Sequence, residues 1–330
     1  MAKVETIRGP IDSTGLGRVL IHEHVFLMDM EYTFNYRPDF FSDETITKAA
    51  ARLDALKAAG IDTIVDLTVL GLGRHIPSLA KVAALTEVNI IVSTGAYSFN
   101  EVPAPFSFYG PGLLKDPGLE PMIAHFVGDI TQGIGGTSIK AGELKCAIDT
   151  PGLTPGVERI MRAIGQAHRQ TGTPITVHTA PLERTGLIAQ RVLAEEGVDL
   201  ADVVVGHCGD TSDLDYLMKV ADGGSILGMD RFGVEFTITM QSRVDTIAAL
   251  VKRGYVGQLA LSHDCCCWSD FFPQVEDYHA AMPNHHYLHL SRDVIPALLE
   301  AGVTSGDIDT MFITNPRRHF EAAADRFAAQ

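Results

Sequence analysis

The sequence has no apolar stretch near the roughly 20 residues that a membrane-spanning helix requires, and Met1 to Pro10 lack a signal-type hydrophobic segment. Basic residues are scarce: 26 Lys and Arg stand against 41 Asp and Glu, and the net charge of −15 repels nucleic acids and anionic membranes. The five cysteines, three of them consecutive, do not form the dispersed, even-numbered pattern of a secreted disulfide framework. We therefore expect a cytoplasmic protein with free thiols and no nucleic-acid or membrane partner.

Linkers and low-complexity tracts are also missing, which argues against a division into separate domains. With 330 residues and 46% hydrophobic composition, the chain can bury a large core. The sequence thus predicts one domain over residues 1–330.

Strand-like apolar segments alternate with amphipathic helical segments along the chain. Strands are expected at residues 17–24, 61–67, 88–94, 139–147, 174–178, 203–207, 225–229 and 258–264. Helices are expected at residues 40–60, 76–85, 119–134, 154–170, 185–196, 212–220, 241–253 and 292–301. No Gly-x-Gly-x-x-Gly follows the first strand, so this order favours a closed (β/α)8 TIM barrel over a dinucleotide-binding sheet.

Three other segments carry weaker expectations. Residues 95–117 combine aromatic residues with Pro and Gly and are expected to form a loop that could line a pocket. The C-terminal helix that begins near Asn315 is expected to pack outside the barrel. His285, His286 and His289 are interpreted as part of a solvated loop.

The first strand ends in His22 and His24, two residues apart. Side chains at i and i+2 of a strand point to the same side, so both imidazoles could bind one metal ion. An ordinary strand end with two hydrogen-bonded histidines explains the pair equally well. The other strand ends must decide between these interpretations.

Barrel enzymes carry their chemistry at the C-terminal ends of the strands. Six metal-compatible or ionisable side chains fall there: His22, His24, Lys145, His178, His207 and Asp264. Taken singly, His178 and His207 could be ordinary hydrogen-bonded histidines at strand ends, and Asp264 could cap the turn that follows it. Together they favour a metal site, with Asp264 as a carboxylate ligand and proton acceptor. His263 points to the opposite side of its strand and is interpreted as structural.

Lys145 lies within the apolar run Leu144-Lys145-Cys146-Ala147. A buried ammonium would be repelled by metal ions, so the amine is expected to be neutral. A neutral amine can take up carbon dioxide and become a carbamate. That reaction would turn a cation into a carboxylate-like ligand.

These six residues, in this order on successive strands, resemble the binuclear-metal amidohydrolase superfamily. The flanks Leu20-Ile21-His22-Glu23-His24, Val177-His178-Thr179-Ala180 and Gly206-His207-Cys208-Gly209-Asp210-Thr211 resemble the phosphotriesterase family more narrowly. The resemblance implies that N6-carboxylated Lys145 and a hydroxide bridge two divalent ions, zinc first, with cobalt, iron and manganese as alternatives. It further implies that His22, His24 and Asp264 hold the more buried ion, and His178 and His207 the more exposed one.

Two positions separate branches of this family. Phosphotriesterases carry a tryptophan after strand three and a His-Ile-Pro type sequence with a long insertion after strand seven; this chain has Tyr97 and Arg231 there. Both features resemble the phosphotriesterase-like lactonases. We therefore expect hydrolysis of N-acyl homoserine lactones, a quorum-quenching activity, by attack of the bridging hydroxide, with slower hydrolysis of organophosphate triesters. The alternatives are a dedicated aryldialkylphosphatase and a catalytically silent metal-binding scaffold.

The roles of the surrounding residues follow from this interpretation. Asp264 and Tyr97 are the expected catalytic residues, with Tyr97 orienting the carbonyl or stabilising the oxyanion. Arg231 either contacts the substrate or braces its loop. Cys266 and Trp268 belong to an aromatic loop over residues 265–289 that offers a surface for an acyl tail, a packed lid or a subunit contact. The resemblance also suggests a homodimer, with residues 61–74 and the aromatic loops as contact regions.

Overall fold

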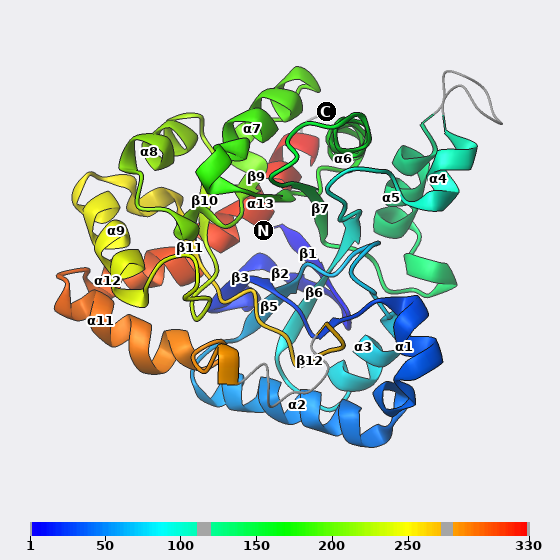
Figure 1. Cartoon of the computed structure of the whole chain (residues 1–330), viewed down its shortest axis with the longest axis horizontal. Helices are drawn as coiled ribbons and strands as arrows, with labels where there is room; N and C mark the ends of the chain where they lie inside the picture. The colour runs from blue at the N-terminus through cyan, green and yellow to red at the C-terminus, as the bar shows by residue number, and fades with distance from the viewer. Residues whose placement is uncertain (1, 111–119, 272–279, 329–330) are drawn as a thin grey trace.

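The computed structural model describes residues 2–110, 120–271 and 280–328 of the chain. Eight parallel strands lie side by side in the order β11-β10-β9-β8-β7-β6-β5-β3 and curve into a barrel at the centre of the molecule (Figure 1). Their bounds are β3 Val19–Glu23, β5 Thr63–Asp66, β6 Asn89–Gly95, β7 Glu143–Ile148, β8 Ile175–Thr179, β9 Val203–Val205, β10 Ile226–Met229 and β11 Leu259–Leu261. The predicted (β/α)8 TIM barrel is confirmed.

A ring of helices covers the outside of the barrel (Figure 1). The helices that match the predicted ones are α2 Asp43–Ala58, α3 Ile76–Ala83, α5 Pro121–Thr131, α6 Pro155–Thr171, α7 Thr185–Glu195, α8 Leu214–Asp222, α9 Met240–Lys252 and α11 Ile295–Glu300. The last of these continues a π-helical segment, Leu290–Val294. Among the described helices, none is both long and apolar enough to cross a membrane.

Helix α6 illustrates why these segments are helical. Thr154 caps its first turn by accepting a hydrogen bond from the backbone N–H of Val157, and the helix stops at Gly172, which adopts φ of 70°. A left-handed residue at this position suits glycine because it has no Cβ to clash. Between these ends, Val157 and Ile164 lie on the face that is buried against the barrel, where each contributes about 1.5–3 kcal/mol.

The barrel interior forms its own apolar cluster below the strand ends that carry the polar residues. It comprises Val4, Leu16, Val19, Ile21, Val65, Leu67, Ile91, Val204, Ile226, Ala260 and Phe320. Phe320 comes from the C-terminal helix α13, Asn315–Ala328, and its neighbour His319 reaches the buried Glu143 of β7 at 3.1 Å. The helix thus packs outside the strands, as expected, and in addition its side chains close the N-terminal end of the barrel.

Several elements were not predicted. A hairpin of β1 Lys3–Thr6 and β2 Gly9–Asp12 begins the described chain, and α12, Ser305–Asp309, precedes a second π-helical segment and α13. After β3, the chain forms β4 Phe26–Leu27, which pairs with β12 Trp268–Ser269, and then α1 Met30–Tyr36.

The segment at residues 95–117 is not wholly a loop. It contains α4, Ala104–Tyr109, while positions 111–117 lie outside the described residues. The free state expected for the five cysteines is confirmed.

Candidate metal centre

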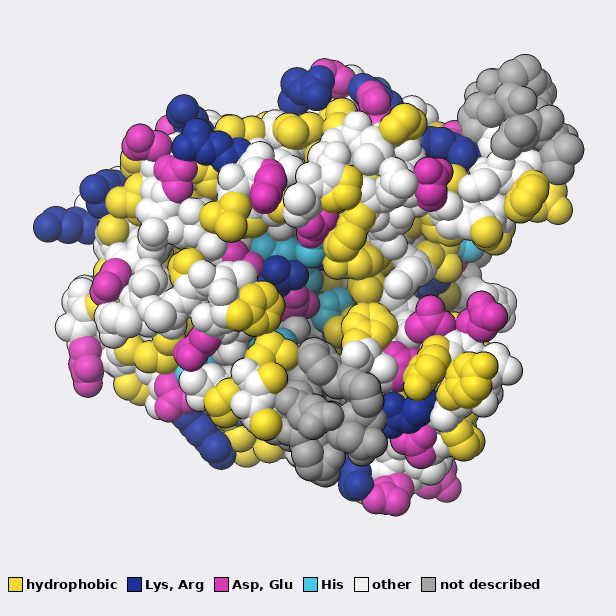
Figure 2. Space-filling model, in the orientation of Figure 1, with side chains coloured by type: hydrophobic (Ala, Val, Ile, Leu, Met, Phe, Trp, Pro, Cys, Tyr) yellow, Lys and Arg dark blue, Asp and Glu magenta, His cyan; other side chains and the backbone are white. Residues whose placement is uncertain are grey.

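Histidine and acidic side chains gather in a hollow at the middle of the face shown in Figure 2. The hollow holds a cavity of about 160 Å³, whose lining residues are His22, His24, Leu27, Gly71, Leu72, Tyr97, Lys145, His178, Arg231, Asp264 and Phe271. His207 lies beside it, with its Nε2 2.7 Å from Nδ1 of His178. The fold thus brings all six side chains expected at the strand ends together around one small cavity.

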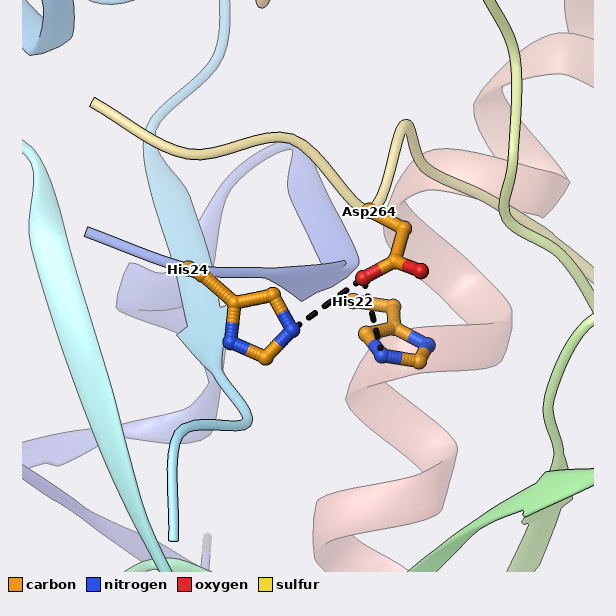
Figure 3. Close-up of side chains that lie close together, drawn as sticks. All are labelled: His22, His24 and Asp264. Atoms are coloured by element: carbon orange, nitrogen blue, oxygen red, sulfur yellow. Dashed lines mark ion pairs between the residues drawn. The ribbon is translucent and has the colours of Figure 1, made fainter. Parts of the chain in front are cut away.

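His22, His24 and Asp264 form the first donor group, and their side chains converge in Figure 3. Oδ1 of Asp264 lies 3.1 Å from Nε2 of His24 and 3.5 Å from Nε2 of His22. Both histidines are buried, and Asp264 adopts a left-handed φ of 57° that turns the chain sharply after β11. Three donor atoms of the kinds that zinc prefers therefore face one point.

The hydrogen-bond partners of Nδ1 in His22 and His24 determine which ring nitrogen carries the proton. Nδ1 of His22 lies 2.7 Å from Oδ2 of Asp230, and a carboxylate can only accept, so Nδ1 donates. Nδ1 of His24 lies 2.8 Å from Oγ1 of Thr68, whose hydroxyl donates to the carbonyl of Phe26. Both Nε2 atoms thus keep their lone pairs for the cavity side, as metal-binding histidines do.

His178 and His207 form the second donor group. Nε2 of His178 lies 2.5 Å from Oδ2 of Asp149, and Nδ1 of His207 lies 3.0 Å from Oδ1 of Asp230, so both nitrogens donate outward. The remaining nitrogens, 2.7 Å apart, then present two lone pairs to each other. Burial lowers the pKa of both rings, to about 4 for His178, so a proton does not readily resolve this conflict at neutral pH. A metal cation that accepted both lone pairs would resolve it.

Asp230 joins the two donor groups. It is fully buried after β10, and its two carboxylate oxygens each hold one imidazole, His22 on Oδ2 and His207 on Oδ1. The backbone N–H of His207 also donates to Oδ1 at 2.7 Å. His207 has a left-handed φ of 63°, a backbone conformation that is unfavourable for a residue with a Cβ. The hydrogen bond to Asp230 stabilises this conformation and so holds the imidazole in place.

Lys145 projects from β7 between the groups. Its Nζ lies 3.3 Å from Nε2 of His22, and its side chain is buried. Burial lowers the pKa of this amine to about 8, against the opposing attraction of Asp264 and Asp230. A substantial fraction is therefore neutral just above neutral pH, the form that carbamylation requires. Imidazoles, a carboxylate and a neutral amine together suit a pair of divalent ions.

Tyr97 and Arg231 border the cavity. The Tyr97 ring lies edge-on to His178 with centroids 5.2 Å apart, and burial raises the pKa of its phenol, so it stays a hydrogen-bond donor. Arg231 donates from Nε to Oδ2 of Asp264 at 3.0 Å and from Nη1 to Oδ2 of Asp210 at 3.1 Å. Arg231 therefore braces Asp264 as well as lining the cavity.

Cys266 and Trp268, predicted to contact substrate, lie elsewhere. Cys266 lines a separate cavity of about 230 Å³ with Arg52 and His286, whereas Trp268 packs against Phe40 with ring centroids 5.0 Å apart. Among the described residues, neither lines the metal cavity, because the chain after Asp264 turns away toward α2. The structure does not support a substrate contact for either.

The sequence predicted a solvated loop for His285, His286 and His289, but two of these three histidines are buried. His285 is buried with its Nε2 2.8 Å from the carbonyl of His263, and His289 is buried beside Asp293. His263 is structural, as expected: its Nδ1 lies 2.8 Å from Glu23 Oε1 and its Nε2 accepts the N–H of Leu290.

Sequence reasoning missed the residues that orient the donors: Asp230, Asp149 and Thr68. Asp230 directly follows β10, Asp149 directly follows β7, and Thr68 lies two residues after the end of β5. The rule that selected the donors, reading the side chain at each strand end, would have selected Asp230 as well had it been applied to the seventh strand.

The fold and the donor set define a metal-dependent hydrolase of the TIM-barrel type. The family model of the phosphotriesterase family matches residues 2–320. A phosphotriesterase homology protein of Mycobacterium tuberculosis is 54% identical over 323 residues, which cover 97% of this chain and 98% of that protein. An aryldialkylphosphatase of Saccharolobus solfataricus is 36% identical over 311 residues, covering 94% and 96%.

A solved structure of the phosphotriesterase from Mycobacterium tuberculosis superposes with a TM-score of 0.94 at 53% identity and covers 97% of this chain and 98% of its own. The chain belongs to the phosphotriesterase family, whose members are binuclear-metal hydrolases. The resemblance inferred from the motifs is thereby confirmed.

Proposed function

We propose that this protein opens lactone rings, foremost those of N-acyl homoserine lactones, and hydrolyses phosphotriesters more slowly. One observation carries the proposal: the inward-facing nitrogens and Asp264 meet at a small cavity that is bordered by a phenol, Tyr97, and a guanidinium, Arg231. This pair matches the features that set the lactonases apart in sequence. A dedicated aryldialkylphosphatase is the second candidate, favoured by the name of the relative that is 36% identical.

We propose the same metal ligands that the family resemblance of the motifs implies. His22, His24 and Asp264 would hold one divalent ion, His178 and His207 the other, and carboxylated Lys145 would bridge them, with zinc as the first candidate. When bound, the two ions supply a water activated near neutral pH and polarise the bond under attack. Zinc as the native metal and a cytoplasmic location stay predictions.

The protein's own groups supply the rest of the chemistry. Asp264 is the proton acceptor: although burial alone would raise its pKa, the neighbouring histidines and Arg231 hold that pKa well below the usual range. It is therefore ionised when an activated water loses its proton, and can return the proton to the departing alkoxide. Tyr97 donates its hydroxyl hydrogen to the oxygen on which negative charge develops.

The shape beside the metal centre suits a small ring with a tail. Leu27, Leu72 and Phe271 provide the apolar part of the cavity wall. Phe271 also lines an adjoining open groove of about 460 Å³, together with Tyr32 and Tyr36. The groove contains Asp29, Glu31 and Asp270 as well, which would repel an anionic tail. A neutral acyl amide is therefore favoured over a charged substituent.

A parallel assay tests the substrate class. The metal-loaded protein is offered a series of N-acyl homoserine lactones of increasing tail length and, separately, an aryl dialkyl phosphate. We expect a higher kcat/KM for at least one lactone than for the phosphate. A kcat/KM for the phosphate well above that for every lactone would favour the aryldialkylphosphatase over the lactonase. A metal-loaded protein that hydrolyses neither substrate would contradict both candidate functions.

A homodimer is also proposed, with a revised contact region. Residues 61–74 are mostly buried within β5 and the turn after it, so they offer little surface. Exposed aromatic side chains gather instead on α1 and the turn after it, where Phe34 is 60% exposed and stacks on Phe41 at a centroid distance of 5.0 Å. Such a patch favours a protein contact. Light scattering of a Phe34→Asp variant tests it, and an unchanged dimer mass would exclude this surface.

A further inference from the structure

The barrel closes between β3 and β11, and the first metal donor group straddles this seam. Beyond the last paired residues of β11, the chain is tied to β3 by two backbone bonds: Asp264 N–H donates to the His22 carbonyl at 3.1 Å, and His24 N–H donates to the Cys265 carbonyl at 2.9 Å. The position of Asp264 relative to His22 and His24 therefore depends on how this seam is held.

Glu23, the residue between the two histidines, reaches across the seam. Its side chain is completely buried, and its carboxylate accepts four hydrogen bonds. Oε1 accepts from Ser262 Oγ at 2.9 Å and from the backbone N–H and Nδ1 of His263 at 2.8 Å each. Oε2 accepts from the backbone N–H of Cys265 at 2.9 Å. All four donors belong to the turn that carries Asp264.

Each contact requires an acceptor at Glu23. The hydroxyl of Ser262 already accepts the N–H of His22 at 2.9 Å, so its own hydrogen points to the carboxylate. Nε2 of His263 accepts the N–H of Leu290, so the proton of that ring is on Nδ1. The remaining two donors are backbone amides. A side-chain amide at position 23 would turn an N–H toward one of these donors.

The hydrogen bonds enclose the strained residue of the turn. Asp264 has a left-handed φ of 57°, which a residue with a Cβ rarely adopts. The N–H groups before and after it, on His263 and Cys265, both donate to Glu23. This arrangement holds the turn in a shape that presents Oδ1 to the imidazoles of His22 and His24.

We propose that Glu23 is a positioning residue for the metal centre, which holds Asp264 and His24 in the geometry that binds one of the two ions. The inference rests on the proposed binuclear site. A purely structural role is the alternative, and the chain provides a matched control for it. Glu143 is also fully buried and accepts from a hydroxyl, Thr176 Oγ1 at 2.8 Å, and from an imidazole, His319 Nε2 at 3.1 Å, but at the opposite end of the barrel.

The test titrates metal-free protein with Co²⁺ in bicarbonate buffer, and follows binding by calorimetry and the visible spectrum. For wild type we expect two ions. For Glu23→Gln we expect one ion to bind roughly tenfold to hundredfold more weakly, with a changed cobalt spectrum, as found when residues that orient metal ligands are altered. For Glu143→Gln we expect a lower melting temperature but two ions at wild-type affinity.

Glu23→Gln binding both ions with wild-type affinity and spectrum would overturn the inference and leave the proposed function standing. Equal loss of affinity in Glu143→Gln would also overturn it, because the effect would then be general destabilisation. A wild type that binds no Co²⁺ would overturn the proposed function and this inference with it. Should Glu23→Gln not fold, Glu23→Asp keeps the charge but draws the carboxylate back from the four donors; it should weaken the same ion at least threefold, and unchanged affinity would refute the role.

Discussion

Arg231 and Asp264 form an ion pair in which Nε donates to Oδ2 at 3.0 Å, while the other oxygen of the same carboxylate, Oδ1, faces Nε2 of His24 at 3.1 Å. The two oxygens of Asp264 thus have different partners. A guanidinium stays protonated at any pH at which proteins fold, so Arg231 provides a permanent positive charge and cannot receive the proton that Asp264 accepts.

The first prediction concerns this charge. Arg231→Gln should raise the pKa of Asp264, because one of the charges that lower it is lost. Activity depends on ionised Asp264 and is lost as pH falls through that pKa, so the acidic limb of the pH–kcat/KM profile should move to higher pH. The matched control is Arg184→Gln, which removes a more exposed arginine paired with Asp213. An acidic limb that stays in place would contradict the role assigned to Arg231.

The second prediction concerns the shared carboxylate of Asp230. Asp230→Asn replaces one acceptor oxygen by a donor, so it disturbs His22 or His207 and, through their common partner, both donor groups. We expect roughly tenfold to hundredfold weaker metal binding, measured as retained metal after dialysis against graded chelator. Thr68→Val disturbs only His24 and should weaken one ion alone. Wild-type affinity for both ions in Asp230→Asn would show that the residue orients neither group.

The third prediction is a pH dependence of metal loading. Burial lowers the pKa of Lys145 to about 8, so the fraction of neutral amine rises as pH rises from 7 to 9. Since only the neutral amine reacts with carbon dioxide to form a carbamate, loading of metal-free protein with Zn²⁺ at a constant concentration of dissolved carbon dioxide should become faster over this interval. Carbon-13 bicarbonate should give a carbamate NMR signal in wild type that Lys145→Ala lacks. Full metal content and hydrolysis in Lys145→Ala would refute a bridging role.

The fourth prediction separates Tyr97 from the metal ligands. Tyr97→Phe removes the hydroxyl and keeps the ring that packs against His178. We expect kcat to fall by about 100-fold, the usual effect of losing an oxyanion donor, with unchanged metal content. Tyr255→Phe, whose hydroxyl donates to Asp222 far from the cavity, serves as the control. An unaltered kcat would leave Tyr97 with a packing role only.

Much of the fold was predictable because its signals are local. The apolar runs that became β5, β6 and β8 and the amphipathic repeats that became α2 and α6 each express a period that neighbouring residues set. The errors and omissions fell where distant contacts decide. Phe320 closes the N-terminal end of the barrel, and His285 is hydrogen-bonded to the carbonyl of His263. The local sequence around neither residue differs from that of a surface helix or loop.

The candidate site shows the same division. The sequence by itself determined which side chains stand at the strand ends, since parallel strands in a barrel all deliver their last residues to one rim. Only the tertiary structure decided which nitrogen of each histidine faces the cavity, because that choice depends on acceptors from distant segments. Asp230 lies 208 positions from His22, and Glu23 lies 240 positions from His263. Hydrogen bonds of this kind follow from the closed barrel, and no spacing along the chain encodes them.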